Sequence, residues 1–483
     1  MRTENQKTLT VPARASVGFT ATGLLARGIG VLLTPLFSRL LTAEEYGLYS
    51  LYLTWLGIFT VLATLGIAGS VLYRGMQKFR TDGAAFLCSA SSLSALFFFV
   101  SLLLYLLFHA AIDRFTGLGM NLTLLLFMQI GANLSLSLFA AECRYRYRPL
   151  PYALFTLGGE VLSALAALLL IRYAPHPETA RIYATLGVSL LFALPLTVLR
   201  YRRGGCLFRR EHLSFLLPFT LSLFPHYAAS VLLSEGGRAV VGRRLGRAAL
   251  AGYGITSSLG LSLSFLSVGI GAAYQPWVMR KIAAGEGEKI ADVSARLSLL
   301  FTLLSSLSML VMPEIFSLLA PAEYRESLPA VLPLALSVLP HFLSSVLAGI
   351  LLTKENVRPV TTVTLAVALL SLLADAVFVP RFGAVASGFV TLGTAYLLFF
   401  LRLFTVRRAG VGRVLFFGRT VLMLVCALFF SAAVFLLFPF FTVRLILFFL
   451  LAVPTALFAR RVYETMKEIP ALESSPEHVI ENE

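Results

Sequence analysis

The sequence predicts an all-α membrane protein that crosses the bilayer many times. Of its 483 residues, 58% are hydrophobic and only 13% are charged, and the mean hydropathy is +0.84. A soluble domain carries roughly 25% charged residues, so this chain lacks the polar surface that a soluble protein needs. Apolar stretches of about 20 residues, long enough to cross a bilayer as helices, recur from one end of the chain to the other.

Fourteen apolar stretches are candidate transmembrane spans. Backbone N–H and C=O groups inside lipid must bond within the protein, so these stretches are expected to be helices. An even number of spans places both termini on the same side of the membrane. The stretches are 15–38, 47–72, 84–108, 118–141, 152–171, 182–199, 213–237, 250–272, 293–312, 329–352, 359–379, 384–406, 414–438 and 440–459.

The basic residues predict the orientation of these spans. The net charge is +16 and the pI is about 10, but the bases lie in short clusters between apolar stretches. That placement is typical of cytoplasmic loops and argues against a nucleic-acid partner. Most of the 40 Lys and Arg residues become cytoplasmic if both termini are cytoplasmic, as expected in a bacterial cytoplasmic membrane. Four arginines after the seventh span contradict this pattern: Arg238, Arg243, Arg244 and Arg247.

The four cysteines are scattered without CxxC spacing, which predicts neither a disulfide framework nor a metal site. The chain also contains no P-loop, H-E-x-x-H motif or nucleophile elbow. We therefore expect no cofactor, no catalytic residues and no ATP hydrolysis. Any driving force would come from an ion gradient, the membrane potential or the substrate gradient.

An internal repeat divides the chain. Arg39-Leu40 with Ala43 and Gly47 recurs as Arg244-Leu245 with Ala248 and Gly252, an offset of 205 residues. Pro175 and Pro380 share that offset, and Thr185-Leu186-Gly187 recurs 206 residues later as Thr391-Leu392-Gly393. The offset superposes span 1 on span 7, so the two six-helix halves have the same orientation. Parallel repeats of this kind place a substrate site between the halves of a transporter.

These boundaries predict six segments. They are a cytoplasmic N-terminus (1–14), an N-terminal six-helix bundle (15–199), a basic cytoplasmic linker (200–212), a C-terminal six-helix bundle (213–406), two additional spans (414–459) and an acidic cytoplasmic tail (460–483).

Four short motifs stand out between or beside the spans: TPLFSRLLTAEEYGLY at 34–49, RAALAGYG at 247–254, EYRES at 323–327 and VPRFGAVASG at 379–388. They resemble the motifs of the oligosaccharide flippases, the polysaccharide-transporter branch of the multidrug/oligosaccharidyl-lipid/polysaccharide exporter superfamily. The resemblance extends over nearly the whole chain, from about residue 15 to 460. Many relatives carry an Asp-Arg pair near the end of span 7, where this chain instead has Glu235 and Arg238, three residues apart.

The resemblance implies a fold and an activity. The fold is two six-helix bundles in a V, often with two extra helices. The activity is alternating-access transfer of an undecaprenyl-diphosphate-linked oligosaccharide from the inner to the outer leaflet. Membrane lipid, and glycosyltransferases or a polymerase of the same pathway, are the partners to expect.

Charged residues inside the spans are the candidate site residues, because intramembrane charge is costly and usually faces a cavity. Arg27, in the middle of span 1, supplies the permanent cation that a diphosphate needs; alternatively, it pairs with Glu160. Glu235 and Arg238 share a helix face and form either a gated substrate-binding pair or an ion pair at the membrane boundary. Glu160 and Asp375 are candidates for coupling to a proton or cation, and Asp375 alternatively lies in the boundary layer.

Several other functions fit parts of the pattern. A lipid II or spore-wall precursor flippase would differ only in its sugar. A multidrug cation antiporter would need an acidic cavity, against which Arg27 argues. A membrane-embedded glycan polymerase would need a large catalytic outer loop, and a scaffold without transport activity would tolerate loss of every cavity charge.

Overall fold

The computed structural model describes residues 11–173, 176–353, 357–410, 415 and 417–468. Within these residues the chain is helical and contains no strand, so the all-α prediction is confirmed. The elements, in order, are α1 (Val11–Leu40), α2 (Ala43–Thr64), α3 (Ser70–Lys78), the 3-10 helix η1 (Arg80–Asp82), α4 (Gly83–Thr116), α5 (Met120–Tyr145), α6 (Pro149–Tyr173), α7 (Pro177–Gly204), α8 (Arg210–Leu245), α9 (Arg247–Gly260), α10 (Ser264–Ala283), α11 (Gly287–Leu319), the 3-10 helix η2 (Ala322–Ala330), α12 (Val331–Thr353), α13 (Val357–Phe382), α14 (Val385–Arg408), α15 (Phe417–Leu436) and α16 (Phe441–Glu468).

Thirteen helical segments of the described chain are long and apolar enough to cross a membrane. A fourteenth span arises if Arg247–Gly260 and Ser264–Gly271, which are bent by 43° at their junction, count as one broken span. That pair corresponds to the predicted window 250–272. The described chain therefore has 13 candidate spans, and the predicted number of 14 is reached when this bent pair is counted as the eighth.

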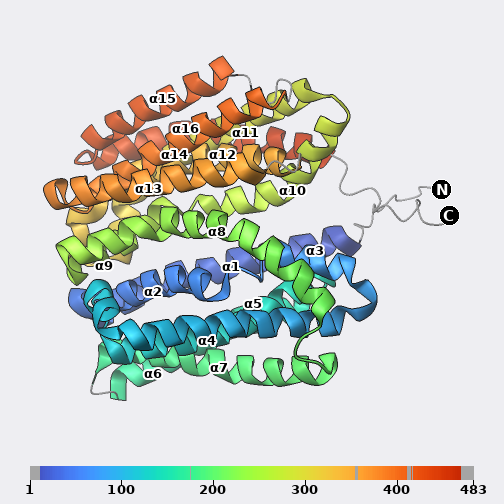
Figure 1. Cartoon of the computed structure of the whole chain (residues 1–483). Helices are drawn as coiled ribbons and strands as arrows, with labels where there is room; N and C mark the ends of the chain where they lie inside the picture. Colours follow the sequence, from blue (N-terminus) through green and yellow to red (C-terminus); the bar gives the residue numbers. More distant parts are fainter. Residues whose placement is uncertain (1–10, 174–175, 354–356, 411–414, 416, 469–483) are drawn as a thin grey trace, which may run out of the picture.

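The helices form two groups, which we call the N-lobe (α1–α7) and the C-lobe (α8–α16) (Figure 1). α1 begins and α16 ends at the same end of the bundle, here called the terminus face. At the other end, the opposite face, α2 of the N-lobe packs against α8 and α9 of the C-lobe. The lobes are thus joined near the sites at which the repeated motif begins α2 and α9.

Some predicted boundaries are wrong. The window 47–72 is interrupted because α2 ends at Thr64, where Leu65 and Gly66 adopt positive φ angles of 51° and 66°. α8 runs eight residues beyond the predicted end at 237, and this extension carries three of the four anomalous arginines. α7 and α8 also extend into the predicted linker and leave only 205–209 outside a helix. Pro175, the first ten residues and the tail beyond 468 lie outside the described residues.

The start of α2 shows why the first motif has its sequence. Thr42 and Glu45 form a capping box, in which the Thr42 Oγ1 accepts from the Glu45 N–H and the Glu45 carboxylate accepts from the Thr42 N–H. Gly47 follows because the next lobe lies against it: a Cβ at this position would be 2.1 Å from the Arg247 carbonyl oxygen. The motif therefore combines a helix start with the close approach of the two lobes.

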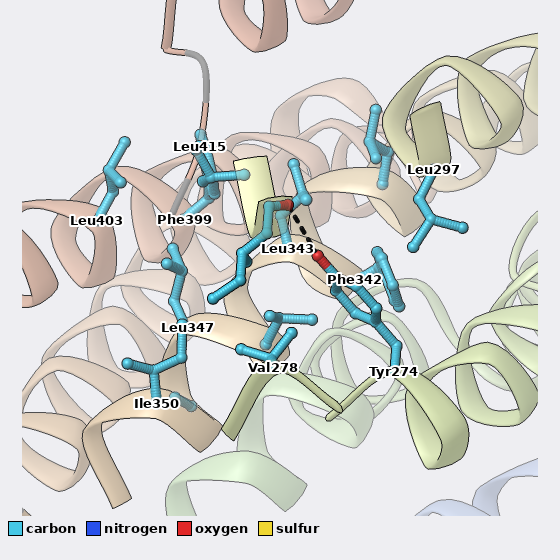
Figure 2. Close-up of a cluster of buried hydrophobic side chains, with 14 of the residues drawn as sticks. Tyr274, Val278, Leu297, Phe342, Leu343, Leu347, Ile350, Phe399, Leu403 and Leu415 are labelled. Atoms are coloured by element: carbon cyan, nitrogen blue, oxygen red, sulfur yellow. Dashed lines mark hydrogen bonds between the residues drawn. The ribbon is translucent and has the colours of Figure 1, made fainter. Parts of the chain in front are cut away.

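The C-lobe core lies between α10, α11, α12 and α14. Figure 2 shows Leu347 near Phe399 in it, and Phe342 beside Tyr274. The last helix, α16, is attached by an ion pair: Arg444 is 3% exposed, and its guanidinium donates to both Glu314 carboxylate oxygens of α11, at 2.8 and 2.6 Å. α16 is thus held on the C-lobe by charge as well as by apolar contact.

Candidate functional site

A large polar cavity lies in each lobe. The N-lobe cavity has a volume of about 560 Å³ and lies among α1, α2, α5, α6 and α7. The C-lobe cavity has a volume of about 610 Å³ and lies among α8, α9, α10, α12, α13 and α14. The charged residues that line them are Glu160 and Arg181 in the N-lobe, and Glu235, Arg238, Asp375 and Arg402 in the C-lobe.

Arg181 is the main cation of the N-lobe cavity. Its guanidinium carbon lies 4.0 Å from the centre of the Phe37 ring and 4.1 Å from that of Tyr49, so the side chain is held between two aromatic faces. Its Nη1 is buried without a hydrogen-bond partner. Among the described residues, no carboxylate lies within 4.0 Å of this guanidinium. Arg181 is therefore a cation held in place by two rings, and one of its guanidinium nitrogens is left without a hydrogen-bond partner.

The rest of the N-lobe cavity supplies neutral polar groups. The Gln129 amide nitrogen donates to the Asn133 amide oxygen and to the Ser189 hydroxyl, both at 2.9 Å. The Gln129 side-chain oxygen is buried and has no partner. Amides and hydroxyls beside a free guanidinium are the groups that bind sugars and phosphates.

Arg27 and Glu160, whose pairing is the alternative to a substrate-binding role for Arg27, are separated. Glu160 lines the N-lobe cavity together with Arg181. Arg27 is exposed, lines neither of the two cavities, and lies 4.8 Å from the centre of the Phe265 ring of α10. The alternative pairing of Arg27 with Glu160 is not present among the described residues. Arg27 is instead a contact between the first helix of the N-lobe and the C-lobe.

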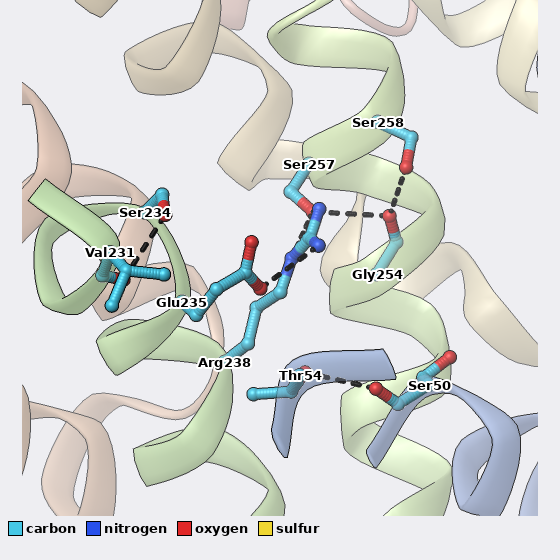
Figure 3. A network of polar contacts seen from close by, with 9 residues as sticks. All are labelled: Ser50, Thr54, Val231, Ser234, Glu235, Arg238, Gly254, Ser257 and Ser258. Carbon is cyan, nitrogen blue, oxygen red and sulfur yellow. Dashed lines mark hydrogen bonds and ion pairs between the residues drawn. The ribbon is translucent and has the colours of Figure 1, made fainter. Parts of the chain in front are cut away.

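Glu235 and Arg238 form an ion pair on the wall of the C-lobe cavity (Figure 3). The Arg238 Nη1 lies 3.4 Å from the Glu235 carboxylate, while its Nε and Nη2 donate to the Ser257 hydroxyl at 3.2 and 2.8 Å. A Cβ on Gly57 of α2 would lie 3.2 Å from the Glu235 side chain. The pair therefore lies where the N-lobe touches the C-lobe, and its arginine is already partnered.

Asp375 is buried inside the C-lobe. It is only 1% exposed, and one carboxylate oxygen has no hydrogen-bond partner. Gly237 leaves room for it, since a Cβ there would lie 3.2 Å from the other carboxylate oxygen and 2.4 Å from the Ser387 hydroxyl. The burial of Asp375 disagrees with the alternative of a boundary position in contact with headgroups.

The sequence interpretation missed Arg181 and Arg402 as cavity residues. Arg181 lies just before the predicted window 182–199, but Pro177 is a helix-start signal that could have placed it within the first turns of α7. Arg402 falls inside a predicted window and is 6% exposed; its guanidinium donates to the Ser344 carbonyl and hydroxyl and to the Thr364 hydroxyl. Arg402 lines the C-lobe cavity because α14 packs against α12 and α13, and the sequence alone does not predict that packing.

The arginines at the opposite face bridge the lobes. At the end of α1, the Arg39 guanidinium donates to the Leu318 carbonyl in the last turn of α11, at 2.8 Å. From the C-lobe, Arg243 donates to the Phe115 carbonyl and Arg247 to the Gly117 carbonyl, the latter at 3.1 Å, both at the end of α4. We call these three contacts the arginine latch. Each one satisfies carbonyls that a helix C-terminus leaves free.

Two solved structures share this architecture, and one sequence relative is similar to the chain. The lipid II flippase MurJ, in an inward closed conformation, superposes with a TM-score of 0.67 at 12% identity, over 93% of this chain and 99% of that one. An inward-facing multidrug resistance MATE family transporter of the MOP superfamily gives a TM-score of 0.59 at 15% identity, over 82% of this chain and 98% of that one. An uncharacterized membrane protein of Haemophilus influenzae is 24% identical over 309 residues, which are 60% of this chain and 71% of the relative.

The fold is therefore that of the lipid II flippase MurJ and of a MATE family transporter. The family model described as polysaccharide biosynthesis protein matches residues 14–281, more than half of the chain, and the MatE model matches residues 223–377. The chain belongs to the polysaccharide biosynthesis protein family, within the multidrug/oligosaccharidyl-lipid/polysaccharide exporter superfamily.

Proposed function

We propose that this protein flips an undecaprenyl-diphosphate-linked oligosaccharide from the inner to the outer leaflet of a bacterial cytoplasmic membrane. The observation that carries the proposal is the Arg181 guanidinium, which faces a polar cavity and, among the described residues, has no carboxylate within 4.0 Å. A diphosphate presents the oxygens that such a guanidinium binds through paired hydrogen bonds. Gln129, Asn133 and Ser189 around it suit the hydroxyls of a sugar.

Arg27 and the Glu235–Arg238 pair have different roles in this proposal. Arg27, exposed on α1 and stacked on Phe265, would make the first contact with the diphosphate between the lobes. Arg238 is already bonded to Glu235 and Ser257, so it would bind substrate only after exchanging those partners. That exchange would couple substrate arrival to movement of the lobes at the face where Gly57 touches Glu235.

Glu160 and Asp375 are the proposed coupling acids. Each lines a cavity, and Asp375 is buried with one oxygen unpartnered. A carboxyl group in such a place changes its charge by taking up a proton or a cation, which makes it suitable for coupling to a gradient. The N-lobe and the C-lobe would rock about their junction, with the terminus face and both termini cytoplasmic. Pathway glycosyltransferases or a polymerase would supply or consume the substrate.

A lipid II flippase is the second candidate, because the fold similarity to the lipid II flippase MurJ covers 93% of this chain. Its substrate class would use the same diphosphate and prenyl contacts, so the sugar alone separates the two proposals. A drug-cation antiporter is less well supported. Each cavity is lined by as many arginines as acids, one of each in the N-lobe and two of each in the C-lobe, whereas a cation needs an excess of acids.

The test is a flipping assay in proteoliposomes. Wild-type protein should flip an undecaprenyl-diphosphate oligosaccharide, and Arg181→Gln should slow flipping by about ten-fold or more, because it removes charge-assisted hydrogen bonds to phosphate. Arg181→Lys should restore only part of the rate, since it keeps the charge but loses the planar fork. Arg172→Gln, an exposed arginine of α6, is the matched control.

The same liposomes distinguish the alternatives. Lipid II and a cationic drug are offered beside the oligosaccharide lipid, and the flipped substrate identifies the function. Wild-type rates in Arg181→Gln would refute the proposed diphosphate site even if flipping itself is observed.

A further inference from the structure

A second basic site lies outside both cavities, at the terminus face of the N-lobe. Here the ends of α5 and α7 meet the starts of α4 and α6 around a pocket of about 110 Å³. That volume is several times the roughly 15 Å³ that a single water needs. We call it the rim pocket; it is lined by Ala84, Leu87, Phe139, Glu142, Cys143, Arg146, Arg148, Pro151, Leu196, Leu199, Arg200 and Arg203.

The rim pocket is strongly basic, with four arginines against one acid. That acid, Glu142, is already used, since its carboxylate lies 2.9 Å from the Arg146 Nε. Arg200 is 8% exposed and is fixed by donating to the Ser135 carbonyl at 2.9 Å. The guanidinium groups of Arg148 and Arg203 make no ion pair or side-chain hydrogen bond within the described part of the chain. Two cations are therefore free to bind an anion.

The backbone holds the walls of the pocket in place. Tyr147, between two of the arginines, has a φ of 53°, and this turn is closed by the Arg148 N–H donating to the Cys143 carbonyl at 2.9 Å. On the other side, α7 ends tightly against α4, because a Cβ on Gly204 would lie 2.1 Å from the Cys88 sulfur. Arg148 and Arg203 thus project from two closely packed helix ends.

The lining of the rim pocket also includes apolar side chains, which form what we call its apolar wall. Leu87, Leu196 and Leu199 line it together with Phe139. Phe139 also lines the N-lobe cavity, and its ring centre lies 4.9 Å from that of Phe155, another residue of that cavity. The basic part of the pocket and the N-lobe cavity are therefore adjacent and separated by aromatic side chains.

We infer that the rim pocket binds the phosphate group of a membrane lipid, with Arg148 and Arg203 on the phosphate and the apolar wall against the start of the lipid chain. Arginine binds phosphate through two parallel hydrogen bonds, and basic pockets between helices on the cytoplasmic side take anionic headgroups. The cytoplasmic placement of this face rests on the proposed function. An anionic phospholipid and the phosphate end of the lipid-linked substrate share the chemistry required; the latter would make the pocket a loading site.

The test measures lipid binding to the purified full-length protein in detergent by native mass spectrometry. The probes are phosphatidylglycerol, undecaprenyl phosphate and diacylglycerol, which has no phosphate. The wild type should bind the first in preference to the third. The double variant R148Q/R203Q should weaken phosphatidylglycerol binding by about ten-fold or more, whereas R202Q, an exposed neighbour outside the pocket, should stay within about two-fold.

Competition identifies the source of the phosphate. If undecaprenyl phosphate displaces phosphatidylglycerol, the pocket accepts the substrate type; if it does not, the ligand is a phospholipid. R148K/R203K should recover part of the binding, which separates lost charge from misfolding. Equal binding by R148Q/R203Q and the wild type, or equal binding of diacylglycerol, would overturn the inference. The binding assay does not depend on flipping, so its result can still be interpreted if the proposed transport activity fails.

Discussion

Removing the arginine latch should open the opposite face of the transporter. The perturbation is the triple variant R39A/R243A/R247A, which deletes the guanidinium contacts to the carbonyls of Leu318, Phe115 and Gly117. The matched control is R244A. Arg244 is exposed on the same helix end and has no side-chain hydrogen bond or ion pair among the described residues.

The magnitude follows from the exposure of these groups. A hydrogen bond to a charged group contributes about 1.5–3 kcal/mol. The three contacts are exposed to solvent, however, and exposed charge pairs contribute about 0.2–1 kcal/mol. Taking about 0.7 kcal/mol each gives about 2 kcal/mol for the three. That free energy changes the ratio of closed to open populations by about 30-fold.

The assay is a distance measurement between spin labels at Glu44 of α2 and Arg325 of η2, two exposed positions on different lobes at this face. The wild type and R244A should show mainly the shorter distance, and the triple variant should show a substantial longer component. Added salt should shift the wild type the same way, because exposed charges are screened. A triple variant with the distance distribution of R244A would refute the latch.

Three further predictions concern single residues. Gly47→Ala places a Cβ 2.1 Å from the Arg247 carbonyl oxygen, so this face should not close and flipping in proteoliposomes should slow about ten-fold; a wild-type rate would contradict the close approach. Asp375→Asn removes a buried acid, so flipping should no longer respond to an imposed pH gradient, whereas a response equal to that of the wild type would exclude Asp375 from coupling. Arg444→Met leaves the Glu314 carboxylate unpaired, and because that carboxylate is 38% exposed the loss of stability should be about 2 kcal/mol rather than the larger value of a fully buried pair; a melting temperature equal to that of the wild type would show that the pair does not hold α16.

The fold could be predicted because one physical constraint dominates it. Lipid leaves helices as the way for separate apolar stretches to satisfy their backbones, so hydropathy locates the spans. Hydropathy does not report backbone conformation, which explains the errors. The left-handed Leu65 ends α2 inside a continuous apolar window, and the junction after Gly260 breaks another. The predicted window for α8 ends too early because its polar last residues continue the helix beyond the apolar stretch that hydropathy detects.

The site could be predicted only in part, because the sequence does not give the rotation of a helix about its axis. Arg27 and Arg181 both carry a cation near or within a span, yet Arg181 faces the N-lobe cavity and Arg27 lies outside both cavities. The two arginines differ in their tertiary contacts, because Phe37 of α1 and Tyr49 of α2 hold the Arg181 guanidinium in place. The spacing of residues within α7 does not predict these contacts. Asp375 was identified by its type, but its burial follows from the packing of α8 against α13.

Two of the arginines that contradict the expected charge bias, Arg243 and Arg247, have a structural reason that also links the two halves of the repeat. α4 and α11 are the third and ninth spans, equivalent under the six-span repeat, and each ends at the opposite face with unsatisfied carbonyls and the negative end of its dipole. Arg39 comes from span 1 to the end of α11, and Arg243 comes from the equivalent span 7 to the end of α4. Each lobe thus places a cation on the other lobe's helix end, in a reciprocal arrangement. Because both contacts cross the same junction, rocking of the lobes must break them together, which makes release of this face a cooperative step.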